Sequence, residues 1–215
     1  MGMRLGHLGW GLLLLLVGLT GADSAEADSR FYVVGGIGFI SVGGENEAAQ
    51  FRNPGWSATA GLRLAITNRL KIGVNGEYAR AGFDATEFFE QNNVFLSNPE
   101  ERTEGGDLEI LAATGEVILD IPVDKTTVLY AKVGGGMYSW TTTRLFVNNQ
   151  GIESVIPEST IDIPDGESPG GYAGGGVRFP LGESAGIWID FSVVFLEPDN
   201  GAMRLIPLRV GISLP

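Results

Sequence analysis

Two consecutive runs of alternating residues, joined by a turn, constrain the fold of this chain more than any other feature. Residues 57–78 read SATAGLRLAITNRLKIGVNGEY. On both sides of Asn68-Arg69, nearly every second residue is apolar, and the residues between them are small, polar or charged. A period of two over two runs joined by a turn signal is typical of a β-hairpin. This hairpin therefore has one apolar face and one polar face.

The same alternation recurs along the chain and predicts eight strands. The runs are residues 31–42, 57–66, 70–78, 108–121, 127–140, 171–181, 187–196 and 207–214. The connections 43–55, 87–107 and 145–170 are long and polar, whereas the others are short: 68–69, 123–126, 182–186 and 197–201. An even number of strands with tight turns at one end predicts an all-β, eight-stranded antiparallel up-and-down barrel.

The distribution of glycine indicates which face of the barrel meets lipid. Many of the 33 glycines lie on the polar face of the runs, where a narrow interior needs them and a solvated surface does not. The runs are also close to the roughly 9–11 residues that a tilted transmembrane strand needs. On the apolar face, aromatic residues gather near strand ends, as in the aromatic girdles of membrane barrels. We therefore expect a transmembrane β-barrel with a polar lumen.

The N-terminus has the pattern of a cleavable secretory signal peptide. A basic start at Arg4 precedes an apolar run over residues 8–19 and a small-residue end at Ala25-Glu26-Ala27. We expect residues 1–27 to be the signal peptide and 28–215 the barrel domain, with cleavage after Ala22 as an alternative. The chain has no cysteine, so an exported form must be held together by something other than disulfides, such as a closed sheet.

Three stretches resemble a known family. Residues 32–39, YVVGGIGF, resemble the first strand of small outer-membrane barrels, and residues 130–138 and 207–214, PLRVGISL, resemble the fifth and last strands. The family is the eight-stranded outer-membrane β-barrel group that includes OmpA-like transmembrane domains and OmpX/Ail-type proteins. The resemblance implies a Gram-negative-type cell outer membrane, with outer-membrane lipid and the barrel-assembly machinery as partners. Family members usually end in an aromatic residue that this machinery reads, whereas this chain ends Leu214-Pro215.

The composition argues against several kinds of active site. The single histidine, His7, lies in the expected signal peptide, and the chain has no cysteine. This excludes Ser-His and Cys-His catalysis and His-based zinc sites from the remainder of the chain. A formal net charge of −12 argues against nucleic acid as a partner. We therefore predict no catalytic residue, no cofactor and no metal site.

The polar face carries charges of both signs. We predict a lumen charge network and list its members here: Arg63, Lys71, Glu77, Glu116, Asp120, Lys132, Arg178, Asp190 and Arg209. Strand tilt should bring them into one mid-barrel band, where they pair, because an isolated buried charge is costly. Glu116 and Lys132, on neighbouring strands, are one expected pair.

The long loops are acidic, which indicates a solvated crown or a binding surface for a partner. Apolar residues in the second long loop form a candidate contact patch or a small loop core: Phe88, Phe89, Phe95 and Leu96. The predicted function is a non-enzymatic outer-membrane protein with a plugged lumen, acting in membrane integrity or in surface recognition and adhesion through its extracellular loops. The alternative is a soluble periplasmic, lipocalin-like carrier of an apolar ligand.

Overall fold

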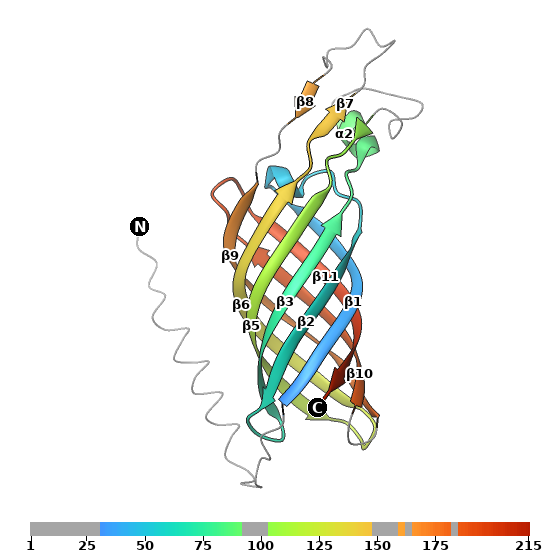
Figure 1. Cartoon of the computed structure of the whole chain (residues 1–215), viewed down its shortest axis with the longest axis vertical. Helices are drawn as coiled ribbons and strands as arrows, with labels where there is room; N and C mark the ends of the chain where they lie inside the picture. Colours follow the sequence, from blue (N-terminus) through green and yellow to red (C-terminus); the bar gives the residue numbers. More distant parts are fainter. Residues whose placement is uncertain (1–30, 92–102, 148–158, 162–164, 182–184) are drawn as a thin grey trace.

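The protein folds into a closed antiparallel β-barrel, seen in a computed structural model (Figure 1). The structure describes residues 31–91, 103–147, 159–161, 165–181 and 185–215. Neighbouring strands follow the order β1-β11-β10-β9-β6-β5-β3-β2, and β2 closes the ring by pairing with β1. This confirms the predicted eight-stranded antiparallel barrel. The expected signal peptide, 1–27, lies outside the described residues.

The barrel strands are longer than the alternating runs. They are β1 (Phe31–Gly44), β2 (Gly55–Ala65), β3 (Leu70–Ala81), β5 (Leu108–Pro122), β6 (Val128–Thr142), β9 (Gly166–Leu181), β10 (Ala185–Leu196) and β11 (Met203–Leu214). β9 and β11 begin four or five residues before the runs that predicted them, 171–181 and 207–214. In β11 the added residues are apolar on both faces near Leu205 and Ile206, and in β9 they are Gly-Glu-Ser-Pro-Gly, so neither stretch shows the alternation of apolar and polar residues.

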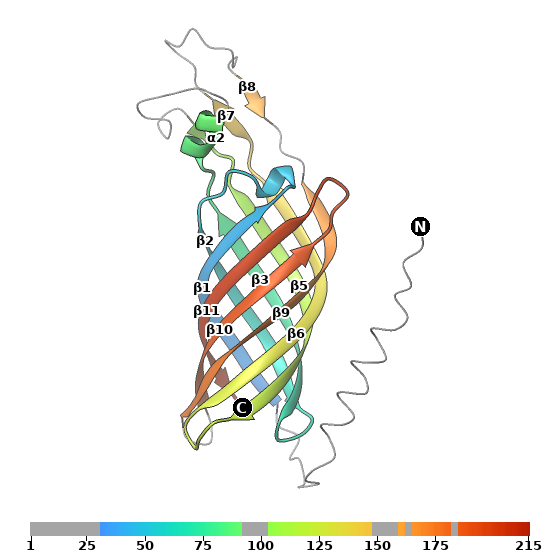
Figure 2. The ribbon, with the colours of Figure 1, turned by 180° about the vertical axis from the view of Figure 1, so that it is seen from behind.

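The two ends of the barrel differ, as Figures 1 and 2 show. At the turn end, short connections join β2 to β3 and β5 to β6, and Val33 of β1 pairs with Leu214 of β11. At the loop end, longer connections carry η1 (Glu47–Ala49) and α2 (Ala85–Gln91). A small separate sheet there consists of β4 (Thr103–Glu104), β7 (Leu145–Val147) and β8 (Ser159–Ile161). In the described part of the chain, no helix is both long and apolar enough to cross a membrane.

The outer face of the barrel is apolar. Phe39 is 71% exposed and Ile37 66%, and outward residues of the other strands include Leu62, Leu111, Phe191 and Ile212. A soluble protein rarely exposes a contiguous apolar band of this extent. Strand pairing continues around the whole ring, so the sheet is closed, as a membrane-spanning sheet requires.

The interior of the barrel has two tiers. The tier near the loop end is an apolar core of inward side chains such as Leu108, Tyr138, Leu196 and Met203, each no more than 2% exposed. The tier from mid-barrel to the turn end contains buried charges together with the apolar group Ile118, Tyr130 and Trp188. The lumen is therefore polar in only part of its length, unlike the polar lumen expected from the sequence.

Inward glycines make room for the large side chains of the lumen. The ring of Trp188 lies over Gly36 and Gly211 on the neighbouring strands, so a Cβ at either glycine would come within 2.3 Å of the indole. Gly35, the next residue along β1, faces outward, and the nearest atom to a Cβ there would be 3.9 Å away. Two adjacent glycines thus have opposite steric surroundings.

We predict that Gly36→Ala destabilises the barrel by roughly 1–3 kcal/mol, because the added methyl group overpacks the Trp188 site. Gly35→Ala is the matched control and should change stability little, since its Cβ meets open space. Urea unfolding in lipid vesicles, followed by tryptophan fluorescence, measures both changes. Equal effects at the two positions would contradict the packing described here.

Candidate functional site

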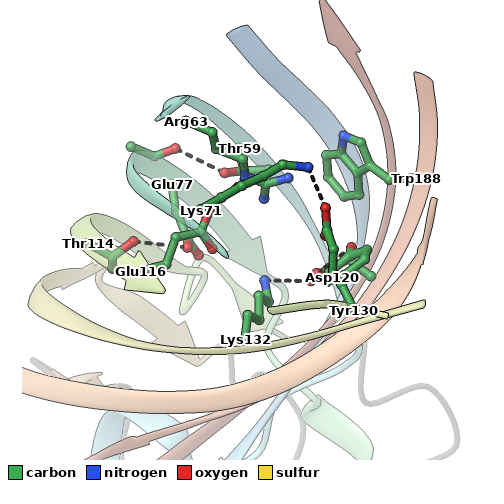
Figure 3. Close-up of polar contacts among 12 residues, drawn as sticks. Thr59, Arg63, Lys71, Glu77, Thr114, Glu116, Asp120, Tyr130, Lys132 and Trp188 are labelled. Carbon is green, nitrogen blue, oxygen red and sulfur yellow. Dashed lines mark hydrogen bonds and ion pairs between the residues drawn. The ribbon is translucent and has the colours of Figure 1, made fainter. Parts of the chain in front are cut away.

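The nine charged residues of the predicted lumen network all face the barrel interior, on β2, β3, β5, β6, β9, β10 and β11. Figure 3 shows Arg63, Lys71, Glu77, Glu116, Asp120 and Lys132 among them. Each acid contacts at least one base. Glu116 Oε1 accepts a bond from Arg63 Nε at 2.9 Å, and Glu77 Oε2 accepts one from Arg209 Nη2 at 2.7 Å. The other two acids, Asp120 and Asp190, are junctions that each accept bonds from two polar side chains.

Asp120 is the junction nearest the turn end. Its Oδ2 atom accepts bonds from Lys71 Nζ at 2.6 Å and from Arg178 Nη2 at 2.5 Å. Asp190, the second junction, accepts from Lys132 Nζ at 2.8 Å and from the Tyr130 hydroxyl at 2.9 Å. Charge-assisted bonds of this kind offset part of the cost of removing these ions from water.

Several of these bonds join residues two strands apart, and in some of them a glycine lies directly between the partners. The register places Gly73 between Arg63 and Glu116, and Gly176 between Tyr130 and Asp190. A Cβ at Gly73 would lie 3.1 Å from both Arg63 Cγ and Glu116 Oε1. The glycine leaves the space through which the two long side chains meet.

Two further bonds follow the same rule. Gly134 lies between Glu116 and Tyr172, whose hydroxyl donates to Glu116 Oε2 at 3.3 Å. Gly38 lies between Arg209 and Ser57, and Arg209 Nε donates to the Ser57 hydroxyl at 3.2 Å. The hydroxyl donors Tyr130 and Tyr172 were not among the predicted network residues. Their inward position opposite glycines is the sequence signal that could have identified them.

The expected pair of Glu116 and Lys132 is wrong. Glu116 bonds to Arg63, and Lys132 bonds to Asp190. In the register, Glu116 lies opposite Gly134, and Lys132 lies opposite the buried Ile118. Each of these two side chains extends instead to a partner two strands away, Glu116 to Arg63 on β2 and Lys132 to Asp190 on β10.

Side chains fill the upper tier above the network. The space between Ile40, Ile110, Tyr138, Val194 and Leu205 amounts to about 10 Å³. This is at the lower limit of the space that holds a single water molecule. The sequence analysis did not predict this core, although both faces are apolar in runs such as residues 193–196, Val-Val-Phe-Leu.

An aromatic cluster joins the loops above the barrel, and we call it the cap core: Phe51, Phe83, Ala85, Phe88, Phe89 and Leu145. Its residues come from three different loops. The Phe88 ring packs on those of Phe51 at 5.3 Å and Phe83 at 5.4 Å between centroids. Phe88 and Phe89 therefore contribute to a loop core, one of the two roles considered for them. Phe95 and Leu96 lie outside the described residues.

Hydrogen bonds also connect the loops to one another. The buried Arg52 donates from Nε to Ala48 O at 2.7 Å and from Nη1 to Gly106 O, which joins the first loop to the second. Burial lowers the pKa of Arg52 to about 10, partly opposed by Asp107, so the guanidinium stays charged at neutral pH. Asn46 Nδ2 donates to Asn200 Oδ1 at 2.6 Å, which joins the first loop to the last.

Among the described residues, no group of three or more histidine, cysteine or acidic side chains is placed to hold a metal ion. The acids of the lumen are each engaged by lysine, arginine, tyrosine or hydroxyl groups. The arrangement thus provides paired charges and packed side chains rather than a group of residues with reactive geometry.

Comparisons with known proteins agree with this geometry. The family described as "Outer membrane protein beta-barrel domain" matches residues 11–200. No curated protein matches the chain significantly.

Solved structures of similar fold include Neisserial surface protein A, at 15% identity and a TM-score of 0.51, covering 86% of this chain and 96% of that one. Ail, the attachment invasion locus protein of Yersinia pestis, matches at 15% identity and a TM-score of 0.45, covering 86% and 99%. A major outer membrane protein from Thermus thermophilus matches at 12% identity and a TM-score of 0.49, covering 86% and 98%.

We predict strong energetic coupling between Arg63 and Glu116. Arg63→Gln or Glu116→Gln alone should cost about 3–5 kcal/mol, because each leaves a buried charge without its partner. The double variant should cost less than the sum by about 0.5–3 kcal/mol. A second cycle, Glu116→Gln with Lys132→Gln, is the control and should show weaker coupling. Unfolding titrations in vesicles measure both cycles, and additive effects in the first would refute the pair.

Proposed function

This chain belongs to the outer membrane protein β-barrel domain family, and we propose that it is a closed, non-enzymatic barrel that acts in membrane integrity and surface recognition. The filled lumen is the observation that carries this proposal. An eight-stranded barrel has an interior just wide enough for side chains. Here packed apolar residues near the loop end and paired charges below them leave no route for a solute among the described residues. A protein closed to transport acts at its surfaces.

The cap supports a recognition role for the loop end. Loops that only needed to be soluble would require no shared aromatic core, whereas Phe51, Phe83 and Phe89 pack together and Arg52 joins two loops. A pre-ordered surface loses less conformational entropy when it binds a partner. We place this end outside the cell and both chain ends of the barrel on the periplasmic side. The acidic loops would then present the recognition surface.

The structure offers little support for the alternative functions. A soluble carrier of an apolar ligand would need a polar outer face and an empty apolar cavity, whereas Phe39 and Ile37 are exposed and the apolar tier encloses about 10 Å³. Catalysis by a histidine or cysteine has no basis in residues 28–215, which contain neither. We propose outer-membrane lipid as the partner of the apolar belt and the barrel-assembly machinery as the partner for insertion; the exposed Phe39 and Ile37 support the first.

We predict that the purified protein gives no steady ion conductance in planar lipid bilayers. The positive control is a triple variant, Tyr138→Ala, Trp140→Ala and Leu196→Ala, which removes large side chains from the apolar tier and should conduct. Heat-dependent mobility on gels verifies that both proteins are folded. Steady conductance by the unmodified protein would overturn the closed-barrel proposal.

We also predict that the cap unfolds separately from the barrel. Phe89, which is 3% exposed, contributes to the cap core, and Phe89→Ala should cost about 3–5 kcal/mol of local packing energy. Protease added to intact cells should then cut the loops faster, while barrel stability stays unchanged. Phe191→Ala, which truncates a lipid-facing side chain, is the control for loop cleavage. Cleavage at the turn 123–127 instead would reverse the proposed orientation.

A further inference from the structure

The turn end of the lumen contains a cavity of about 170 Å³ that the closed-barrel function does not use. We call it the vestibule. Three basic side chains line it, Arg63, Lys71 and Arg178, together with Tyr32 and Ser213. They come from strands on different sides of the barrel, so their charges converge on one space. This arrangement distinguishes the vestibule from the loop end, where the lumen is packed with apolar residues.

Among the side chains that the structure describes, the positive charge around the vestibule exceeds the negative charge; the backbone carboxylate of Pro215 also lines the cavity. Three bases are paired there with two acids, since Arg63 bonds to Glu116 while Lys71 and Arg178 share the same oxygen of Asp120. Both acids are deeply buried, at 4% and 3% exposure, and neither lines the cavity. A water-filled space therefore meets the basic partners of these ion pairs and is shielded from the acidic ones.

The guanidinium groups also keep unused hydrogen-bond donors. Arg63 bonds to Glu116 through Nε, and Arg178 bonds to Asp120 through Nη2. Within the described residues, both Nη groups of Arg63 and the Nε and Nη1 groups of Arg178 have no acceptor, and none of them is sealed from solvent. Arginine donors in a fork suit tetrahedral and planar oxyanions, which accept two bonds at once.

The surroundings hold these donors in position. The Arg63 guanidinium lies 6.0 Å from the Trp188 ring centroid, and Lys71 Nζ lies 5.3 Å from that of Tyr32. Contacts of this kind restrict side chains that otherwise lose considerable entropy on binding. A cleft with low-dielectric walls and charges of one sign also concentrates counter-ions. At about 30 Å³ per water, the vestibule has room for a small oxyanion and part of its hydration shell.

We propose that the vestibule is a binding site for a small oxyanion of the phosphate or sulfate class, held by Arg63, Lys71 and Arg178. The site is distinct from the recognition surface at the loop end, and the apolar tier prevents the anion from crossing. Two sources share this chemistry: free periplasmic oxyanions, and the phosphate of a phospholipid headgroup at the same membrane face. The site binds the anion without passing it through the barrel.

The test is a titration of the unmodified protein with inorganic phosphate in phosphate-free maltoside micelles, with chloride at matched ionic strength as the reference. Nitrogen-15 labelling of arginine reports each Nε–H group by NMR. The resonances of Arg63 and Arg178 should shift and saturate with a Kd on the order of 1 mM. Arg209 is the internal control, because it is a buried lumen arginine engaged by Glu77 and Ser57, and its resonance should not move.

Arg178→Gln should weaken phosphate binding about tenfold, equivalent to about 1.4 kcal/mol. Asp120 still has Lys71 as its partner in this variant, so the barrel should fold. If the variant does not fold, the titration of the unmodified protein alone tests the site. Shifts that stay linear in phosphate, or equal shifts at Arg63 and Arg209, would overturn the site.

Phospholipid nanodiscs identify the source of the anion. If headgroups supply the phosphate, the Arg63 and Arg178 resonances start at their bound positions in nanodiscs without added phosphate. If the ligand is a free oxyanion, the titration in nanodiscs repeats the one in micelles. Both results support the proposed chemistry, whereas no saturable shift in either medium refutes it.

Discussion

An eight-stranded barrel has too little interior space for a large inward side chain at every position, and this steric limit governs the rest of the structure. Glycines at inward positions leave room for the large side chains of neighbouring strands. Gly73, Gly134 and Gly176 each lie between two inward residues on flanking strands, and the flanking side chains meet above them. At these positions the glycines determine how much side-chain volume fits and which residues meet. Lys71 and Asp120, on adjacent strands, pair without a glycine between them.

The two tiers of the lumen exclude water in different ways. Near the loop end, residues such as Leu108 and Met203 exclude water by packing, and the same tier buries the Tyr138 hydroxyl and the Trp140 indole N–H without a hydrogen-bond partner among the described residues. Lower down, every charge that leaves water must be compensated, and tyrosine hydroxyls supply bonds that the ion pairs alone do not. Such a network need not add net stability over an apolar filling. Its contribution is to specify one arrangement, because only one register brings these partners together.

The sequence predicts the outer face of this barrel far better than the inner one. Alternation identified all eight barrel strands, since lipid requires apolar side chains at every outward position. It failed in residues 193–196, where Val194 and Leu196 face the interior while Phe195 faces outward and all are apolar. It placed nine charges in the lumen but could not predict their pairs, because most of the pairs depend on the register across three or four strands. The cap core draws Phe51, Phe83 and Leu145 from separate loops, and no local pattern connects them.

The difference between the tiers also determines from which side the buried charges can be reached. Packing over Tyr138, Leu196 and their neighbours separates the charge network from the loop end, so water and ions approach it only through the turn end. There the described side chains that line the cavity include Arg63, Lys71 and Arg178 and no acidic side chain. An excess of positive charge would be costly inside a sealed lumen, but at a mouth open to solvent a counter-ion can neutralise it. The same apolar tier that closes the barrel therefore makes a basic vestibule tolerable on the other side.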